Sequence, residues 1–202
     1  MAGLRLEGVR PKVLGPVNLT LEAGELVLLS GPSGSGKSLL LRAVADLDPH
    51  EGEVWLDGAA RSAMPPPLWR RRVGLLPAES HWWGERVGEH FATEPGELLA
   101  RLGFDLDVLG WAVGRLSTGE RQRLALARML ALSPQALLLD EATANLDPAN
   151  RERVEGIIAA YREAHGAAVL WVSHDPEQRA RLSRRTPARR LTIEAGRLEP
   201  EP

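Results

Sequence analysis

The chain has 202 residues, 44% of them hydrophobic and 26% charged, and its net charge at pH 7 is −2. These values suit one domain with a substantial core, and the near-neutral charge argues against a nucleic-acid partner. The lack of cysteine excludes a disulfide framework, a cysteine metal site and a thiol nucleophile. The N-terminal residues have no signal-peptide core, and no apolar run reaches about 18 residues, so we expect a cytoplasmic protein that does not span a membrane.

Residues 31–38 read GPSGSGKS and match the phosphate loop G-x-x-x-x-G-K-S in full. The apolar run ELVLLS before the loop has a strand's length, and SLLLRAVADL after it has apolar residues at helical spacing. Glycines let backbone N–H groups curl around phosphate oxygens, and the start of the following helix adds partial positive charge. The predicted nucleotide-binding residues are Gly31, Pro32, Ser33, Gly34, Ser35, Gly36, Lys37 and Ser38. A simple turn between a strand and a helix is the alternative.

Two side chains of this loop have distinct predicted tasks. Lys37 would bring a compact ammonium group to the outer phosphates, and Ser38 would offer its hydroxyl to Mg²⁺. Lysine is scarce here, because Lys12 and Lys37 are the only two lysines among 25 basic residues. A planar guanidinium would substitute poorly for an ammonium at such a position.

Residues 64–83 are harder to interpret. MPPPLW, residues 64–69, is interpreted as a rigid connector. VGLLPAESHWW, residues 73–83, begins as a buried strand, breaks at Pro77 and ends in two adjacent tryptophans. Neighbouring residues of a regular element point in different directions, so Trp82 and Trp83 do not readily enter one core. Either both rings face a partner, or one enters a local helical core while the other lies on the surface.

LSTGERQRLALARML, residues 116–130, predicts a helix with a defined start. Ser117 and Glu120 have the spacing of a capping box, and apolar residues follow on one helical face. A capped helix start is also an anion site, so the structural and functional interpretations are compatible.

ALLLDEATANLD, residues 136–147, predicts a buried parallel strand that ends in two carboxylates. Ligands bind at the carboxyl ends of such strands, so Asp140 would face the Mg²⁺ shell beside Ser38. Glu141 would then polarise an attacking water molecule. The alternative is that the two carboxylates merely end a strand and cap the next helix. A helix at about 148–164 and the strand AAVLWVS follow.

The order GPSGSGKS, LSTGERQR, ALLLDE, ANLD and VSHD resembles the nucleotide-binding domain of ATP-binding cassette (ABC) proteins, over about residues 4–198. The resemblance implies an α/β P-loop NTPase with a mostly parallel core sheet and an N-terminal antiparallel β region. It implies one domain over residues 1–202, with a short helical (signature) subdomain at about 78–117. It also implies an ATPase that works with Mg²⁺ as a head-to-tail homodimer, with two ATP molecules at the interface.

The resemblance assigns further residues to this interface. Ser117, Gly119 and Glu120 would touch the γ-phosphate of the ATP bound by the other subunit, and residues 145–147, ending in Asp147, would cross the dimer axis. Two departures stand out here: Thr118 and Glu120 occupy positions where the commonest family pattern has glycine and glutamine. The Glu120 carboxylate adds negative charge near a phosphate unless it points away.

The resemblance gives His174 contact with the γ-phosphate and, together with Glu141, the orientation of the attacking water. Many family members stack adenine on an aromatic residue near the N-terminus, whereas LRLEGVRPKVLGPV contains none. Arg10 is the predicted substitute, because a guanidinium plane can lie on a ring.

VGLLPAE aligns with a family loop that carries a glutamine, but Ala78 occupies that position here and Glu79 lies beside it. Three alternatives follow. Glu79 takes over the role of the glutamine, a water molecule does so, or coupling through this loop is weaker. Family members receive a short helix from a membrane-spanning permease near this loop. Trp82 and Trp83 are therefore predicted to face such a partner.

The predicted function is the ATP-hydrolysing subunit of a membrane transporter, peripheral on the inner face of the cell membrane. The chain is most similar to small bacterial cassettes for export of iron or another metal. Alternatives are a haem or lipoprotein exporter ATPase, and a soluble ABC ATPase acting on macromolecules. The short span between phosphate loop and signature argues against the coiled-coil members of that last class. A binding-competent but inactive cassette is disfavoured because Lys37, Asp140, Glu141 and His174 are all present.

Overall fold

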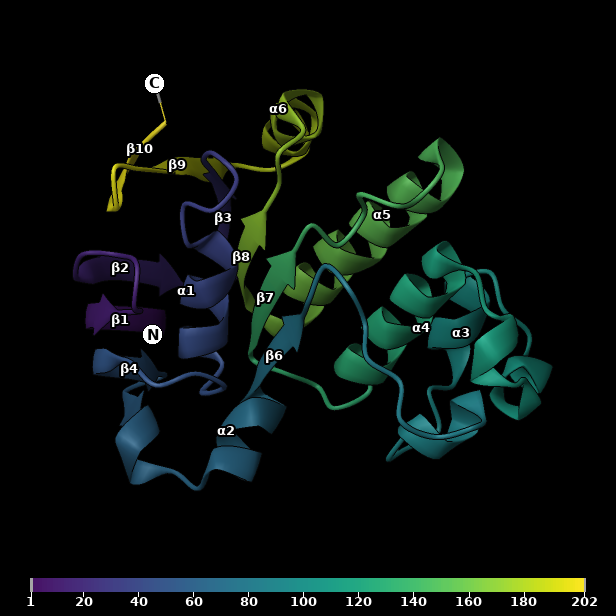
Figure 1. The fold of residues 1–202 in the computed structure, drawn as a ribbon. Helices are drawn as coiled ribbons and strands as arrows, with labels where there is room; N and C mark the ends of the chain where they lie inside the picture. The colour runs from purple at the N-terminus through teal and green to yellow at the C-terminus, as the bar shows by residue number, and fades with distance from the viewer. Residues whose placement is uncertain (1, 202) are drawn as a thin grey trace.

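The computed structural model describes residues 2–201, which form two β-sheets with helices packed between and beside them (Figure 1). The strands are β1 (Ala2–Arg10), β2 (Val17–Glu22), β3 (Leu26–Ser30), β4 (Glu51–Leu56), β5 (Ala59–Ala60), β6 (Val73–Leu76), β7 (Ala136–Asp140), β8 (Ala168–Val172), β9 (Ala188–Glu194) and β10 (Arg197–Pro200). The α-helices are α1 (Lys37–Val44), α2 (Pro66–Arg72), α3 (Glu97–Arg101), α4 (Thr118–Leu130), α5 (Pro148–His165) and α6 (Pro176–Arg185). The 3₁₀ helices are η1 (Arg61–Ala63), η2 (Val87–His90), η3 (Leu106–Gly110) and η4 (Val113–Arg115).

The larger sheet has the order β10-β9-β3-β8-β7-β6, and its strands are parallel except at β10. The smaller sheet, β2-β1-β4-β5, is antiparallel. The predicted α/β architecture, with a mostly parallel core sheet and an N-terminal antiparallel region, is confirmed.

The central strands of the larger sheet are buried on both faces, which explains their continuous apolar sequences. Every residue of β3, β7 and β8 is buried. Side chains of a strand alternate between faces, so Leu26 and Leu28 join one core cluster while Val27 and Leu29 join the other. The first cluster packs the sheet against α4, α5 and residues 87–116, and the second packs it against α1 and the antiparallel sheet.

The carboxyl ends of β3, β8 and β7 lie level with one another. β8 lies between the other two strands and is parallel to both; Leu29 pairs with Val172, which pairs with Asp140 in turn. The loops after the three strands therefore leave the sheet at one edge, where ligands of parallel α/β sheets bind. These loops carry residues 31–36, Glu141 and His174.

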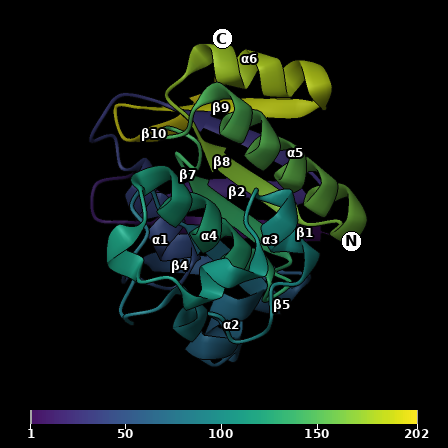
Figure 2. The same ribbon diagram turned by 90° about the vertical axis from the view of Figure 1, so that its right-hand side faces the viewer.

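The region predicted as a helical subdomain, at about 78–117, contains α3, η2, η3 and η4. These short helices pack beside α4 at one end of the molecule (Figures 1 and 2). Their buried side chains join the cluster that also contains Leu124 of α4 and Leu139 of β7. The boundaries of this subdomain remain a prediction.

Residues 66–72 form helix α2, so the interpretation of MPPPLW as a rigid connector is wrong for its second half. Pro66 and Pro67 occupy the first two helical positions, where a missing N–H breaks no helical bond and a fixed φ suits the helix. Trp69 is fully buried, and its Nε1 donates to the carbonyl oxygen of Val44 at 2.9 Å. This hydrogen bond fastens α2 to the end of α1.

Replacing Trp69 by alanine should lower the free energy of unfolding by about 3–5 kcal/mol, because it leaves a large cavity and an unpaired carbonyl. Urea unfolding of the purified protein measures this. Trp83→Ala is the matched control, since the Trp83 side chain is 74% exposed and its removal should cost less than about 1 kcal/mol. Equal losses in the two variants would contradict the packing described here.

Candidate nucleotide site

The loop between β3 and α1 needs glycine at two positions. Gly36, directly before α1, has a φ of 98°, and a Cβ built on it would lie 2.8 Å from Cγ2 of Val13. Gly31 has a φ of 133°, and a Cβ there would lie 2.5 Å from the carbonyl oxygen of Ile193. Side chains at these positions would force the loop open. Such a tight turn at a helix start is the backbone arrangement that cradles phosphate oxygens.

Lys37, the first residue of α1, lies against this loop. It is buried, and its Nζ donates to the carbonyl oxygens of Gly31 and Pro32 at 2.9 and 2.7 Å. Burial lowers the pKa of Lys37, while the nearby carboxylates of Glu141 and Asp140 act in the opposite direction. The ammonium group is thus fixed beside the acidic end of β7.

Three segments that are distant in sequence line one pocket of about 290 Å³. They are the phosphate loop with the start of α1, the end of β7 with the residue that follows it, and the second residue after β8. The lining residues are Ser33, Gly34, Gly36, Lys37, Ser38, Leu39, Asp140, Glu141 and His174. The structure therefore brings most of the predicted phosphate, metal and catalytic residues together.

Glu141 and His174, which follow the carboxyl ends of β7 and β8, are in direct contact. Nε2 of His174 lies 2.9 Å from Oε1 of Glu141. Glu141 has a φ of 49°, which is uncommon for a residue with a side chain, and its N–H donates to the carbonyl oxygen of Val172 at 3.1 Å. Such a backbone conformation costs roughly 1–3 kcal/mol and persists only when the surrounding structure enforces it. The turn places this carboxylate in the pocket.

The same pocket suits Mg²⁺ bound together with phosphates. The Ser38 hydroxyl and the Asp140 carboxylate belong to residues that line this same pocket. Among residues 2–201 no group of three or more His, Asp or Glu side chains could hold a metal alone. Mg²⁺ is commonly held by one or two carboxylates plus substrate phosphates, and this donor set fits that pattern.

The signature segment starts α4 as predicted, through a complete capping box. The N–H of Glu120 donates to Oγ of Ser117 at 3.3 Å, and Oε2 of Glu120 accepts from both the N–H and Oγ of Ser117 at 2.8 Å. These hydrogen bonds lower the pKa of Glu120, so its carboxylate stays ionised and turned toward Ser117. Ser117, Gly119 and Glu120 are not among the residues that line the nucleotide pocket. In Figure 1, α4 lies on the far side of β7 from α1.

Asp147 also lies outside this pocket. It is exposed and caps α5, accepting from the backbone N–H of Asn150 at 3.0 Å and from its Nδ2 at 2.6 Å. The backbone hydrogen bond from Asn150 is the main cause of the lowered pKa of Asp147.

The loop after β6 is held by a residue that the sequence interpretation missed. Gln122 of α4 is buried; its Nε2 donates to the carbonyl oxygen of Pro77 at 2.9 Å, and its Oε1 accepts from Oγ of Ser80 at 2.6 Å. Ala78 and Glu79 are exposed, and neither lines the nucleotide pocket. A polar residue on the buried face of a helix was the signal that could have identified Gln122.

The two tryptophans differ, so the expectation that both face outward is wrong for Trp82. Trp82 is half-buried and packs against the helical core, whereas Trp83 is exposed. The Arg128 guanidinium lies 4.8 Å from the Trp82 ring and 4.9 Å from the Trp83 ring. His90 holds the loop as well, because its Nε2 accepts the N–H groups of Trp83 and Gly84 at 2.9 and 2.8 Å. Trp83 is thus a fixed aromatic side chain on the surface.

Arg10, the predicted adenine platform, does not line the pocket. It is exposed and its Nη1 lies 3.9 Å from Oε2 of Glu51. Val13 is better placed, because it borders the phosphate loop at Gly36 and remains 53% exposed. No pattern in the sequence distinguishes this valine from other surface residues.

A family model described as "ABC transporter" matches residues 14–144, more than half of the chain. The chain belongs to the ABC transporter family. It is an ABC ATP-binding domain, and ATP hydrolysis is its activity.

Relatives of this ABC ATPase serve both import and export. It is 34% identical to the probable iron export ATP-binding protein FetA of Escherichia coli, covering 83% of this chain and 80% of FetA. It is also 34% identical to the phosphate import ATP-binding protein PstB of Aeropyrum pernix, covering 91% of this chain and 83% of PstB. A dimeric ATP-binding cassette bound to ADP and Pi has the same fold, with a TM-score of 0.81, 24% identity and 98% of both chains covered. Over residues 2–201, no helix is long and apolar enough to cross a bilayer.

Gly36→Ala should weaken ATP binding by about tenfold or more, because the new Cβ meets Val13 and shifts the loop. Equilibrium binding of a fluorescent ATP analogue measures the loss. Gly58→Ala is the control: Gly58 also has positive φ, at 81°, but its added Cβ would meet nothing within 4 Å. Both variants should lose some stability, and only Gly36→Ala should lose affinity; unchanged binding in Gly36→Ala would contradict the assignment.

Proposed function

We propose that this ABC ATPase is the energy-supplying subunit of a membrane transporter and works as a head-to-tail homodimer with two Mg-ATP at the interface. One observation carries the proposal. The phosphate loop, Asp140, Glu141 and His174 converge on one pocket, while the capped start of α4 lies outside it. The start of α4 is an anion site outside the phosphate pocket of its own chain. This separation is explained if the α4 start of one copy meets the ATP bound in the pocket of a second copy.

In the proposed mechanism the phosphate loop and Lys37 hold the phosphates of ATP. Ser38 and Asp140 would hold Mg²⁺, which neutralises charge on the phosphate oxygens. Glu141 accepts a proton from the attacking water, and His174, whose Nε2 lies 2.9 Å from Oε1 of Glu141, holds that carboxylate in place. Contact of the His174 ring with the γ-phosphate is part of the same proposal. The restrained backbone at Glu141 fixes the base before the substrate arrives.

The partner subunit's contribution would come from the start of its α4. Gly119 presents a helix N-terminus, and Ser117 presents a hydroxyl that can rotate toward phosphate. The Glu120 carboxylate is occupied by Ser117, which keeps its charge in the capping box. Asp147, at the start of α5, would lie at the same interface.

Glu141→Gln should lower the ATPase rate by about 100-fold or more while ATP binding is retained, because the amide cannot accept the proton. Steady-state phosphate release and ATP binding measure the two properties. Exposed Glu22 supplies the control, Glu22→Gln, which should match wild type. A loss below about tenfold would remove Glu141 from the role of base.

With Mg-ATP, light scattering should show a Glu141→Gln dimer, and a persistent monomer would count against the homodimer.

We propose that the permease docks in a second pocket, of about 250 Å³, lined by residues of α2, β6 and α4 and of the loop after β6. Its lining includes the exposed Trp83 and three arginines, Arg70, Arg71 and Arg128. An exposed aromatic ring beside a pocket is the kind of anchor on which interfaces depend. Burial lowers the pKa of Arg128, and the two tryptophan rings hold its guanidinium in place. The chain would thereby sit peripherally on the inner face of the membrane.

Trp83→Ala should abolish co-purification of a multi-spanning membrane protein from detergent-solubilised membranes of the native host. The bait is tagged Glu141→Gln with Mg-ATP, and bound proteins are identified by mass spectrometry. Trp55→Ala is the matched control, because Trp55 is partly exposed on the distant antiparallel sheet. Soluble partners alone, unaffected by Trp83→Ala, would favour the macromolecular ATPase.

For the cargo we propose iron or another metal, moved outward. The support is the likeness to FetA over 83% of the chain. The likeness to PstB has equal identity and favours import of an anion instead. The membrane protein that co-purifies distinguishes the two, because a permease carries the cargo path.

A further inference from the structure

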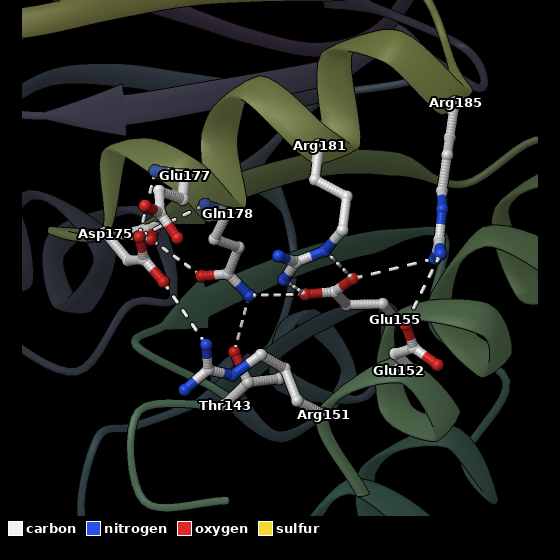
Figure 3. A network of polar contacts seen from close by, with 10 residues as sticks. Thr143, Arg151, Glu152, Glu155, Asp175, Glu177, Gln178, Arg181 and Arg185 are labelled. Atoms are coloured by element: carbon white, nitrogen blue, oxygen red, sulfur yellow. Dashed lines mark hydrogen bonds and ion pairs between the residues drawn. The ribbon is translucent and has the colours of Figure 1, made fainter. Parts of the chain in front are cut away.

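A buried polar network lies behind the nucleotide pocket and joins the two loops that carry its acidic and histidine residues. Figure 3 shows it between α5 and α6. Thr143 belongs to the loop that begins with Glu141, and Ser173 directly precedes His174. Gln178, on α6, lies between them and contacts both.

The side-chain amide of Gln178 bridges these loops with short hydrogen bonds. Its Oε1 accepts from Oγ of Ser173 at 2.7 Å, and its Nε2 donates to Oγ1 of Thr143 at 2.6 Å and to Oε1 of Glu155 at 2.8 Å. All four residues are at least 96% buried. Because unsatisfied polar groups are costly in such surroundings, each of these bonds resists opening.

The network is anchored on its far side by charge. The Glu155 side chain on α5 is only 1% exposed, and Arg181 donates to both of its oxygens, at 2.7 and 3.2 Å. Arg185 lies 3.8 Å from the same carboxylate. With Glu155 fixed in this way, rotation of the Gln178 amide would remove one of the two hydrogen bonds that Oε1 of Glu155 accepts.

A second link supports the first at the start of α6. Asp175 caps the helix by accepting from the N–H groups of Glu177 and Gln178 at 2.9 and 3.2 Å. Arg151 of α5 donates to the same carboxylate at 3.3 Å. The N–H of Asp175 donates to Oγ of Ser173, so the residues on both sides of His174 are held by hydrogen bonds.

We propose that Gln178 is a positioning residue for ATP hydrolysis. By tying Ser173 to Thr143, it sets the spacing of the two loops and thus the 2.9 Å contact between His174 and Glu141. Gln178 does not line the nucleotide pocket, so it acts through these loops and not on ATP. The proposal depends on the ATPase activity and is independent of cargo and permease.

The test compares hydrolysis with binding. Gln178→Met keeps the length of the side chain and removes its hydrogen bonds, so kcat should fall about tenfold or more. The Kd for ATP should stay within about twofold, because the phosphate loop belongs to β3 and α1. Tyr161→Phe is the control for a lost, partly buried hydrogen bond on the same helix as Glu155, since Tyr161 donates to the carbonyl oxygen of Pro134 at 2.8 Å. Its kcat should match wild type.

Thr143 provides an independent arm should Gln178→Met fold poorly. Thr143→Val should lower kcat, and Thr143→Ser, which keeps the hydroxyl, should restore it. If both side chains act through one contact, the double variant should lose no more kcat than the worse single variant. The proposal is overturned if Gln178→Met and Tyr161→Phe have equal kcat, if Kd rises as kcat falls, or if Thr143→Ser is as slow as Thr143→Val. If wild type and Glu141→Gln instead hydrolyse ATP at the same rate, the error lies in the proposed catalytic base and not in the role of Gln178.

Discussion

The level carboxyl ends of β3, β8 and β7 are the constraint on which the rest of the molecule depends. Leu29 is paired with Val172 and Val172 with Asp140, so three loops leave one edge at the same height. A slip of one residue in either pairing would exchange the two faces of a strand that is buried on both sides. The two core clusters therefore hold the register, and the register holds Lys37, Glu141 and His174 around one pocket.

Around this rigid edge, fixation comes from polar contacts in the loops. Gln122 holds the loop after β6, the capping box holds the start of α4, and Gln178 holds the loops after β7 and β8. Gln122 and Gln178 each use a side chain from a helix to restrain a loop after a strand, and Glu120 restrains the start of its own helix. The sheet therefore sets where the nucleotide-binding residues lie, and side chains from α4 and α6 hold the loops that carry or adjoin them.

Features that depend on a local sequence pattern could be predicted from the sequence. The phosphate loop, the acidic strand end and the capping box could be identified because each is a contiguous motif with its own chemistry. The helix at Pro66 was missed because proline usually signals an extended segment and the burial of Trp69 against α1 is non-local. Val13 and Gln178 were missed for the same reason, because contacts with residues distant along the chain determine their place. Trp82 packs against the helical core and Trp83 does not, and no pattern near the tryptophans reveals which of the two rings is buried.

The scarcity of lysine has a practical consequence. Lys12 and Lys37 are the only lysines, and Lys12 is exposed beside Leu39, the residue two positions after Lys37. Lys37 is buried, and its Nζ is enclosed by the carbonyl oxygens of Gly31 and Pro32. Amine-directed labelling with mass-spectrometric readout would therefore report on two lysine side chains, one exposed and one buried. The ratio of their modification is an internal gauge of nucleotide occupancy that needs no engineered probe.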